Sequence, residues 1–246
     1  MTAIAIDIHS KTYSAQGTAP AHRAIANLKL TLTSNEFICL VGPSGCGKTT
    51  LLNIIAGLDP DFKGDIRLET GHKKPVIGYV FQNPRLLPWR TVRENITLAL
   101  AGEHAPETVD ALLDIMQLTQ AQHVYPERLS LGMSRRVSII RAFAVNPDIL
   151  LMDEPFVSLD APTARQVRNL LLELWQRRPH TVLFVTHDLR EAIALADRLL
   201  FLSPSPMTVM GEISVPIARA ERNDEAQVEA FRQKLLAHYP EIKTLL

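Results

Sequence analysis

Apolar residues cluster in short runs over the first forty positions, and these runs predict a sheet-rich start to the chain. They occupy residues 3–8, 25–32 and 37–41, and each predicts a strand. A helical spacing of apolar residues follows the third run, over residues 48–57. A strand, a glycine-containing turn and a helix are therefore expected in direct succession.

The middle of the chain changes to a helical pattern, and the later part alternates between both kinds of element. From about residue 91 to residue 146, apolar side chains recur every three to four positions, which predicts a helical lobe inserted into a sheet domain. The predicted elements after it are strands at 149–152, 181–186 and 199–202, and helices near 163–176 and 189–196. Such alternation predicts parallel strands covered by helices. Residues 219–246 mix charges with apolar positions at roughly helical spacing.

Composition narrows the classes of function. A chain of 246 residues with 46% hydrophobic content can bury the core of one large α/β domain, with or without a smaller lobe. Lys plus Arg and Asp plus Glu each total 26, so no net basic field attracts a polyanion, and we expect no nucleic-acid partner. The two cysteines and eight histidines show neither a disulfide framework nor the spacing of metal ligands.

The hydropathy of the chain indicates its cellular location. No stretch approaches the roughly 18 consecutive apolar residues that a membrane-spanning helix requires. The start of the chain also lacks a basic segment followed by a long apolar run. We therefore expect a soluble, cytoplasmic chain that reaches a membrane only through a partner.

A glycine-rich segment fits the phosphate-loop pattern. It comprises Gly42, Pro43, Ser44, Gly45, Cys46, Gly47, Lys48 and Thr49, and the expected nucleotide-binding residues also include Thr50, which follows it in the predicted helix. Glycines let backbone N–H groups converge on phosphate oxygens, Lys48 reaches the terminal phosphates, and the Thr49 hydroxyl can ligate Mg²⁺. A glycine-rich turn can also be a mere connection, but Lys-Thr in register after a strand favours nucleotide binding.

An acidic pair forms the second candidate site. The apolar run 149–152 predicts a buried strand whose end delivers Asp153 and Glu154. One carboxylate can hold magnesium while its neighbour orients and deprotonates a water molecule, so we assign Asp153 to the metal and Glu154 to the base. The alternative is that the pair simply caps the next helix.

The segment Leu129-Ser130-Leu131-Gly132-Met133, some twenty residues before the acidic pair, resembles the signature of the ABC family, which is usually Leu-Ser-Gly-Gly-Gln. Other members of that motif set follow in the family's order. They are Gln82 after a strand at 76–81, Ser158-Leu159-Asp160 after the acidic pair, and His187 after the strand at 181–186. The resemblance covers residues from about 10 to 200.

This resemblance implies a fold and a domain plan. The fold is an α/β P-loop NTPase core of the ABC ATPase type with a mostly parallel sheet, an N-terminal antiparallel β subdomain and an inserted α-helical subdomain. The ATPase domain would cover residues 1–220, with the helical subdomain at about 88–146. Residues 221–246 would form a C-terminal helical tail.

The resemblance also implies roles for the site residues and their cofactors, ATP and Mg²⁺. Two copies would face head to tail, so that Ser130 and Gly132 of one close on ATP held by Lys48 of the other. Gln82 would sense Mg²⁺ and the attacking water, and His187 would contact the γ-phosphate. The remaining implied nucleotide contacts are Tyr13, stacked on adenine, and Asp160.

Several positions depart from the family pattern. Leu131 and Met133 replace glycine and glutamine, yet leucine favours helix and needs no positive φ, so the signature helix can still begin at Ser130. We favour an active site; the alternative is an ATP-binding regulatory subunit with weak hydrolysis. Asn35 stands where glycine is usual and tolerates a left-handed backbone. Cys46, near Lys48 and a helix start, is either a thiol of lowered pKa or an inert small residue.

Two proline-containing runs, residues 80–89 and 202–206, make the chain similar to the nitrate, sulfonate and taurine group of bacterial importers. The implied partners are membrane permease subunits, a second ATPase subunit in a homodimer and, indirectly, a solute-binding protein. The implied location is the cytoplasmic face of the cell membrane. Leu87 and Trp89 would either dock on a membrane partner or pack in the helical lobe. An ABC protein of translation or DNA repair is disfavoured because the chain has one signature and no long heptad tract.

Overall fold

The computed structural model describes residues 3–15, 17, 20–68, 75–100 and 106–245. The chain divides into two compact units. The first combines Met1–Lys73 with Thr181–Leu246, and the second is Lys74–His180. Within the described residues, no helix has both the length and the apolar character needed to cross a bilayer.

The first unit contains a three-stranded antiparallel sheet in the order β2-β1-β4. Its strands are β1 (Ala3–Tyr13), β2 (His22–Thr33) and β4 (Lys63–Leu68). Buried side chains alternate with exposed ones along β2, where Leu28, Leu30 and Leu32 are buried. This period of two is typical of a sheet with one face on the core, and it confirms the expected antiparallel β subdomain.

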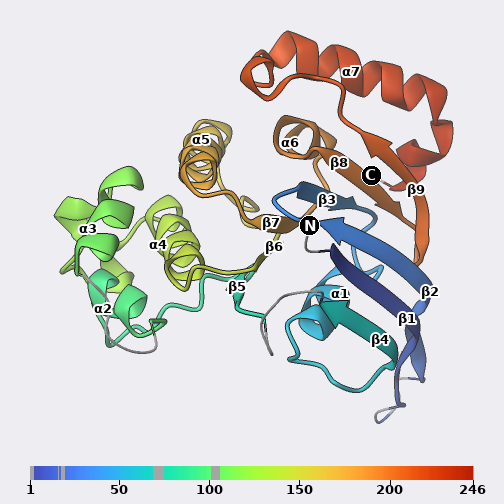
Figure 1. Cartoon of the computed structure of the whole chain (residues 1–246), viewed down its shortest axis with the longest axis horizontal. Coiled ribbons are helices and arrows are strands. Elements are labelled where there is room, and N and C mark those ends of the chain that lie inside the picture. The colour runs from blue at the N-terminus through green and yellow to red at the C-terminus, as the bar shows by residue number, and fades with distance from the viewer. Residues whose placement is uncertain (1–2, 16, 18–19, 69–74, 101–105, 246) are drawn as a thin grey trace. The chain divides into compact units, whose positions relative to one another are not determined.

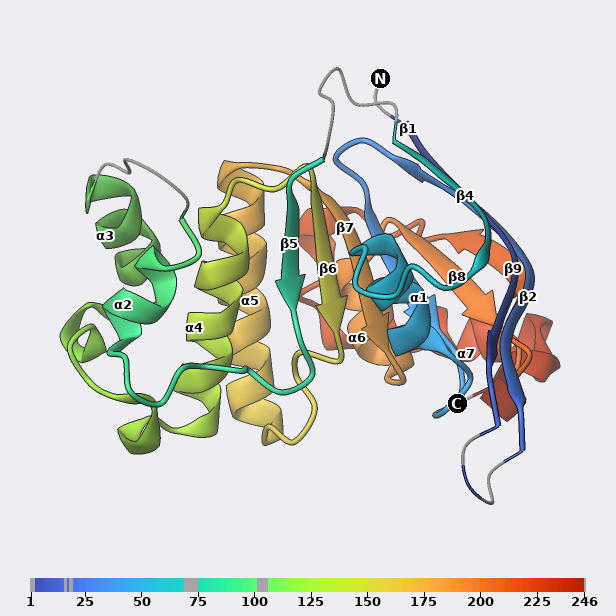
Figure 2. The same cartoon turned by 90° about the horizontal axis from the view of Figure 1, so that it is seen from below.

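Four further strands of the first unit, in the order β7-β3-β8-β9, carry the central part of the fold. β3 (Phe37–Val41), β7 (Thr181–Thr186) and β8 (Arg198–Leu202) are parallel, and β9 (Val209–Ser214) is antiparallel to β8. All residues of β3 and β7 are buried, as strands covered on both faces must be. Figures 1 and 2 show α1 (Lys48–Ile55) on one face, and α6 (Leu189–Leu195) and α7 (Glu225–His238) on the other.

In its described residues, the second unit combines two parallel strands with four α-helices. β5 (Ile77–Val80) pairs with β6 (Ile149–Asp153) from Ile77 opposite Ile149 to Val80 opposite Met152. The helices are α2 (Val92–Thr97), α3 (Pro106–Ile115), α4 (Leu131–Ala144) and α5 (Ala161–Arg177). In Figure 2, α4 lies between α5 on one side and α2 and α3 on the other. Short 3-10 turns at Thr119–Ala121 and Pro126–Arg128 connect α3 to α4.

These elements confirm the expected α/β fold with mostly parallel strands. The first strand runs five residues beyond its predicted end, to Tyr13, and α1 ends two residues before its predicted end, at Ile55. α2, α3 and α4 fall inside the range 88–146, and α7 falls inside 221–246. The domain boundaries at 88, 146 and 220 stay predictions.

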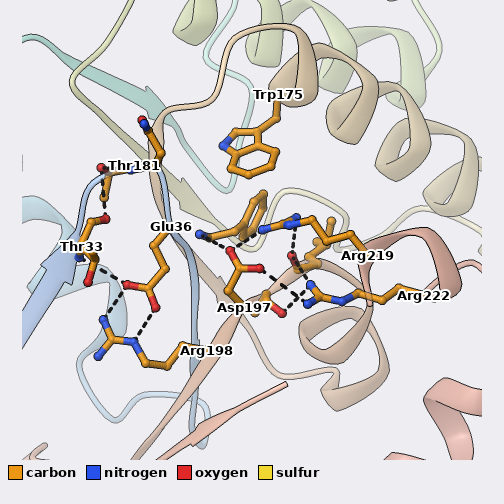
Figure 3. Close-up of polar contacts among 12 residues, drawn as sticks. Thr33, Glu36, Trp175, Thr181, Asp197, Arg198, Arg219 and Arg222 are labelled. Atoms are coloured by element: carbon orange, nitrogen blue, oxygen red, sulfur yellow. Dashed lines mark hydrogen bonds and ion pairs between the residues drawn. The ribbon is translucent and has the colours of Figure 1, made fainter. Parts of the chain in front are cut away.

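A pair of polar clusters anchors the start of β3, the strand that leads to the glycine loop (Figure 3). Glu36 accepts two hydrogen bonds from the Arg198 guanidinium, at 2.8 and 2.9 Å, and Arg198 also donates to the Thr31 carbonyl. Asn35 has φ of 59°, which confirms the expected left-handed turn, and its N–H donates to Thr181 Oγ1 at 3.1 Å. The two-pronged Arg198–Glu36 pair ties the turn before β3 to β8, and the Asn35 hydrogen bond ties it to β7.

The second cluster is centred on Asp197 (Figure 3). Its Oδ2 accepts hydrogen bonds from the Phe37 N–H at 3.0 Å and from Arg219, while Oδ1 pairs with Arg222 at 3.6 Å. Arg222 is buried and also donates to the Ala196 carbonyl at 2.7 Å. The segment before α7 is thereby fastened to the first residue of β3.

Candidate active site

The glycine loop connects the end of β3 to α1 in the conformation that a phosphate loop requires. Gly45 and Gly47 have φ of 75° and 117°, values that L side chains rarely adopt. A Cβ on Gly47 would also lie 3.2 Å from the Ala24 carbonyl oxygen. The loop therefore enters α1 directly at Lys48, with the backbone N–H groups of the first helical turn at its base.

Lys48 is buried within the loop. Its Nζ donates to the carbonyl oxygens of Gly42 at 2.7 Å and Pro43 at 2.9 Å. The ammonium group thus lies across the inside of the turn. Ser44 and Thr49 are exposed beside it, as the phosphate-binding roles expected of the loop require.

Tyr13 is held in a fixed position beside the loop helix. Its hydroxyl lies 3.1 Å from Thr50 Oγ1 and donates to Asp59 Oδ2 at 3.3 Å. The ammonium of Lys11, 2.7 Å from Asp59 Oδ1, lies 4.7 Å from the centroid of the tyrosine ring. The ring is 42% exposed. Stacking of adenine on this ring stays a prediction, and Lys11 and Asp59 are supporting residues that the sequence pattern did not indicate.

The surroundings of Cys46 decide between the two alternatives for its thiol. Its side chain is only 2% exposed, and its Sγ lies 3.9 Å from Met207 Sδ. Burial raises the pKa of the thiol, and the positive charge of Lys48 only partly opposes that shift. Of the two alternatives, the thiol of lowered pKa is therefore wrong, and the buried side chain agrees with an inert small residue. Its contact Met207 lies 161 residues further along the chain.

The buried thiol leads to a prediction about alkylation. At pH 7.5, iodoacetamide should modify native Cys46 at least about tenfold more slowly than free cysteine, because thiolate is scarce and access is blocked. The rate should rise as pH increases toward the raised pKa. Mass spectrometry of peptides after timed quenching measures the rate. Complete modification of the native protein within the half-time of free cysteine would contradict the assignment.

His187 follows β7 at the same edge of the sheet as the glycine loop. Because β3 and β7 are parallel with Val41 opposite Thr186, the residues after each strand leave the sheet side by side. Asp188 caps α6, and the Thr186 hydroxyl donates to Glu191 Oε2 at 2.8 Å and accepts from the Asp188 N–H at 3.1 Å. The His187 side chain is exposed on this braced turn. Its contact with a γ-phosphate stays a prediction.

The acidic pair of the second unit is presented by the end of β6. Asp153 is buried as the last residue of the strand, and Glu154 follows with φ of 43°. A left-handed backbone is costly for such a residue and is typical of functional sites. Gln82, which follows β5, donates from Nε2 to Glu154 Oε2 at 3.4 Å. The structure therefore brings together the predicted base and the predicted sensor, which are 72 residues apart.

The helix after the acidic pair does not use it as a cap. Asp160 caps α5 by accepting hydrogen bonds from the Thr163 N–H at 3.0 Å and the Thr163 hydroxyl at 2.7 Å. These bonds lower the pKa of the exposed Asp160 carboxyl. The alternative role of Asp153 and Glu154 as a helix cap is therefore wrong. The nucleotide contact expected of Asp160 stays a prediction.

The signature segment starts a helix as the sequence predicts. Ser130 is the N-cap of α4, and its Oγ accepts a hydrogen bond from the Met133 N–H at 3.2 Å. Leu131 is helical and 43% exposed, so its side chain points away from the core. Gly132 is buried, and a Cβ there would meet Thr163 Cγ2 at 2.6 Å. The substitution of glycine by Leu131 leaves the first amides of the helix in place.

Trp89 and Leu87 differ in their exposure to solvent. Trp89 is 68% exposed, so core packing is the wrong interpretation for its side chain. Leu87 is half-buried, and its N–H donates to Asn95 Oδ1 at 2.7 Å. Leu98 and Tyr125, at 56% and 46%, are further exposed apolar side chains of the same unit.

The expected site residues lie on both units of the chain. The glycine loop, Tyr13 and His187 belong to the first, whereas the acidic pair, Gln82, Ser130, Gly132 and Asp160 belong to the second. A strand, glycine loop and helix carrying Lys48, in a parallel α/β fold, define a P-loop nucleotide-binding ATPase.

Comparison with known proteins narrows that class. The ABC transporter family model matches residues 25–157. The aliphatic sulfonates import ATP-binding protein SsuB of Bacillus subtilis (strain 168) is 36% identical over 99% of this chain and 96% of its own length. The nitrate import ATP-binding protein NrtD of Synechococcus elongatus is 41% identical over 84% of this chain and 79% of its own.

Solved structures agree with the sequence relatives. A dimeric ATP-binding cassette in a post-hydrolysis state, bound to ADP and Pi, has a TM-score of 0.73 and 30% identity, covering 87% of this chain and 100% of that chain. A second dimeric structure, of a bacterial ABC transporter cassette, has a TM-score of 0.72 over the same shares. The chain belongs to the ABC transporter family, and it is an ATP-binding subunit that hydrolyses ATP.

Proposed function

We propose that this chain powers the import of a small solute of the sulfonate, taurine or nitrate class. ATP hydrolysis by the chain would drive transport through a membrane permease to which it is attached. The observation that carries hydrolysis is the hydrogen bond from Gln82 Nε2 to Glu154 Oε2, beside the buried Asp153. The import role and the class of solute are supported by relatives that are ATP-binding subunits for sulfonate and nitrate import.

In the proposed mechanism, Glu154 accepts a proton from the attacking water. Its carboxylate is half-buried, and the Gln82 amide that donates to it limits its rotation. Lys48 and the loop amides bind the β- and γ-phosphates and stabilise the charge that develops on them. His187, on its braced turn after β7, would contact the γ-phosphate.

Each of the three expected metal ligands carries an oxygen donor, one of them on the first unit and two on the second. Thr49, exposed in the first turn of α1, offers a hydroxyl oxygen, Asp153 a carboxylate and Gln82 an amide oxygen. Oxygen donors of this kind are the ligands that Mg²⁺ prefers. Bound Mg²⁺ would neutralise negative charge on the phosphate groups.

Two copies of the chain would enclose ATP between them. Ser130 and Gly132, at the N-terminus of α4, would face the phosphates bound by Lys48 of the other copy, where the helix dipole favours negative charge. The dimeric state of the solved cassettes supports this arrangement. Because Leu131 keeps the helix start intact, we propose an active site rather than a regulatory subunit with weak hydrolysis.

The exposed Trp89 supports attachment to a permease at the cytoplasmic face of the cell membrane. A large aromatic side chain that is 68% exposed is typical of a contact surface. The permease, in turn, would meet a solute-binding protein, which this chain contacts only indirectly.

Replacing Trp89 with alanine tests the attachment. The free energy of unfolding of the isolated chain should change by less than about 0.5 kcal/mol, because the side chain is mainly exposed. Transport in cells and co-purification with membrane proteins should both fall. Met210→Ala, which removes another exposed apolar side chain, is the control and should preserve both. A large loss of stability in the Trp89 variant would instead indicate a packing role.

The solute class can be tested by deleting the gene in its own host. We expect growth to fail with an alkanesulfonate or taurine as sole sulfur source, or with nitrate as sole nitrogen source. A plasmid copy should restore growth, whereas a copy carrying Glu154→Gln should not. Unchanged growth of the deletion strain on all these sources would disprove the proposed class.

A further inference from the structure

Arg135 is a buried cation on the signature helix, within two turns of Ser130. Only 3% of its surface is exposed. Its guanidinium donates to three backbone carbonyl oxygens, those of Phe81 at 3.3 Å, Gln82, and Val157 at 3.4 Å. These acceptors belong to the segment that carries the proposed sensor and to the segment that leads from the acidic pair to α5.

Burying this charged guanidinium costs free energy, so its position calls for an explanation. Burial lowers the pKa of Arg135, and its Nε has no hydrogen-bond partner among the described residues. All three acceptors are neutral carbonyl oxygens, which compensate a buried charge less well than a carboxylate does. Its three hydrogen bonds join two backbone segments to α4, so the arginine is placed to hold these segments.

A second arginine of the same helix extends the attachment. Arg141 donates to the carbonyl oxygens of Pro84 at 2.7 Å and Arg85 at 2.9 Å. Arg85 itself has φ of 47°, and its guanidinium carbon lies 4.0 Å from the centroid of the Phe81 ring. The loop of residues 81–85 is therefore bound to α4 along its length.

We propose that Arg135 is a positioning residue that links the signature helix to the hydrolytic centre of its own copy. This inference rests on the proposed function, in which Ser130 faces the nucleotide of the other copy while Gln82 and Glu154 face the nucleotide of this one. When ATP draws Ser130 toward the partner, α4 moves, and Arg135 carries the Gln82 backbone with it. The Gln82 amide then places the Glu154 carboxylate, so binding at one site prepares the other.

The planar fork of arginine suits this role better than another cation. Its rigid array of N–H donors fixes the relative positions of two backbone segments, whereas a lysine ammonium on a flexible stem holds its acceptors with less defined geometry. Val157 lies directly before Ser158, whose φ is 66°, and three residues before Asp160. The same guanidinium therefore holds both loops that flank Glu154 and Gln82.

Arg136 offers a matched control. It is the neighbouring residue of the same helix, burial lowers the pKa of its guanidinium, and its Nε also lacks a partner among the described residues. Its guanidinium donates to the Met116 carbonyl at 3.0 Å, in the connection after α3. Arg135→Gln and Arg136→Gln thus remove similar groups from one helix, but only the first touches the loops of the site.

The test compares ATP hydrolysis by the purified full-length wild type and variants over a range of ATP concentrations. Arg135→Gln should lower kcat by about 100-fold, change KM by less than about threefold and reduce the Hill coefficient from above one toward one. Arg136→Gln should keep kcat within about twofold and keep the Hill coefficient. Arg135→Lys, the conservative variant that is less prone to misfolding, should lower kcat by about tenfold and also lose cooperativity.

The possible outcomes separate this inference from the proposed function. If both glutamine variants lose activity in parallel with their melting temperatures, Arg135 is merely structural and the link is wrong, while ATP hydrolysis stands. Arg135→Lys with wild-type kcat and cooperativity would overturn the link in the same way. A wild type that hydrolyses no ATP would disprove the proposed function, and the link with it.

Discussion

Replacing Lys48 with alanine is expected to lower ATP affinity and hydrolysis by about 10²–10³-fold, because the variant loses the cation aimed at the terminal phosphates. In the structure this ammonium lies inside the glycine loop, 2.7 Å from the Gly42 carbonyl oxygen. Binding of a fluorescent ATP analogue with and without Mg²⁺, together with phosphate release, measures both effects.

The control for this prediction is Lys29→Ala. Lys29 is an exposed residue of β2 that pairs with Asp7 at 2.9 Å, and its removal changes the net charge equally. Nucleotide affinity and hydrolysis should be unaffected in the control. If Lys48→Ala bound ATP as tightly as wild type, the phosphate-binding role that we assign to Lys48 would be wrong.

Replacing Glu154 with glutamine should lower the rate of hydrolysis by about 10²–10⁴-fold, the usual contribution of a positioned general base. ATP binding should persist, since the glycine loop is unchanged. Because uncleaved ATP would remain between two copies, the variant should accumulate as a dimer in ATP and Mg²⁺. Phosphate release and light scattering after size exclusion measure the two effects.

Glu173→Gln provides the matched carboxylate control. Glu173 lies on α5 and pairs with Arg177 at 2.7 Å on the surface. Its variant should hydrolyse ATP at the wild-type rate and return to monomer as ATP is consumed. Equal rates for wild type and Glu154→Gln would exclude Glu154 as the base and favour the binding-only alternative.

Local signals in the sequence were sufficient for most elements of the fold. The runs at 37–41 and 181–186 coincide with β3 and β7, because continuous apolar segments of this length form strands buried on both faces. Ser130 begins α4 as predicted, because its hydroxyl can cap the helix wherever the chain lies. Such features depend on neighbours within a few residues.

Residues brought together from distant parts of the chain were not predictable in the same way. The sequence placed Gln82 and Glu154 after strands, but it did not predict the hydrogen bond between them. The pattern contained no signal for Arg135, because an arginine in a helix indicates a solvated surface position unless its acceptors are known. Nor does the sequence decide between docking and packing for Trp89, because the choice depends on its exposure in the folded chain.

By itself, the sequence determined that the chain has a phosphate loop ending in Lys48, an acidic pair at the end of a strand and an ABC-type signature in a parallel α/β fold. The tertiary structure alone decided that Cys46 is buried in contact with Met207, which gives its thiol a raised pKa through burial, and that Arg135 holds two distant loops. The physical reason is the distance along the chain over which each interaction acts. Periodicity and turn chemistry act between neighbouring residues, whereas burial and hydrogen-bond partners depend on which distant segments the folded chain packs together.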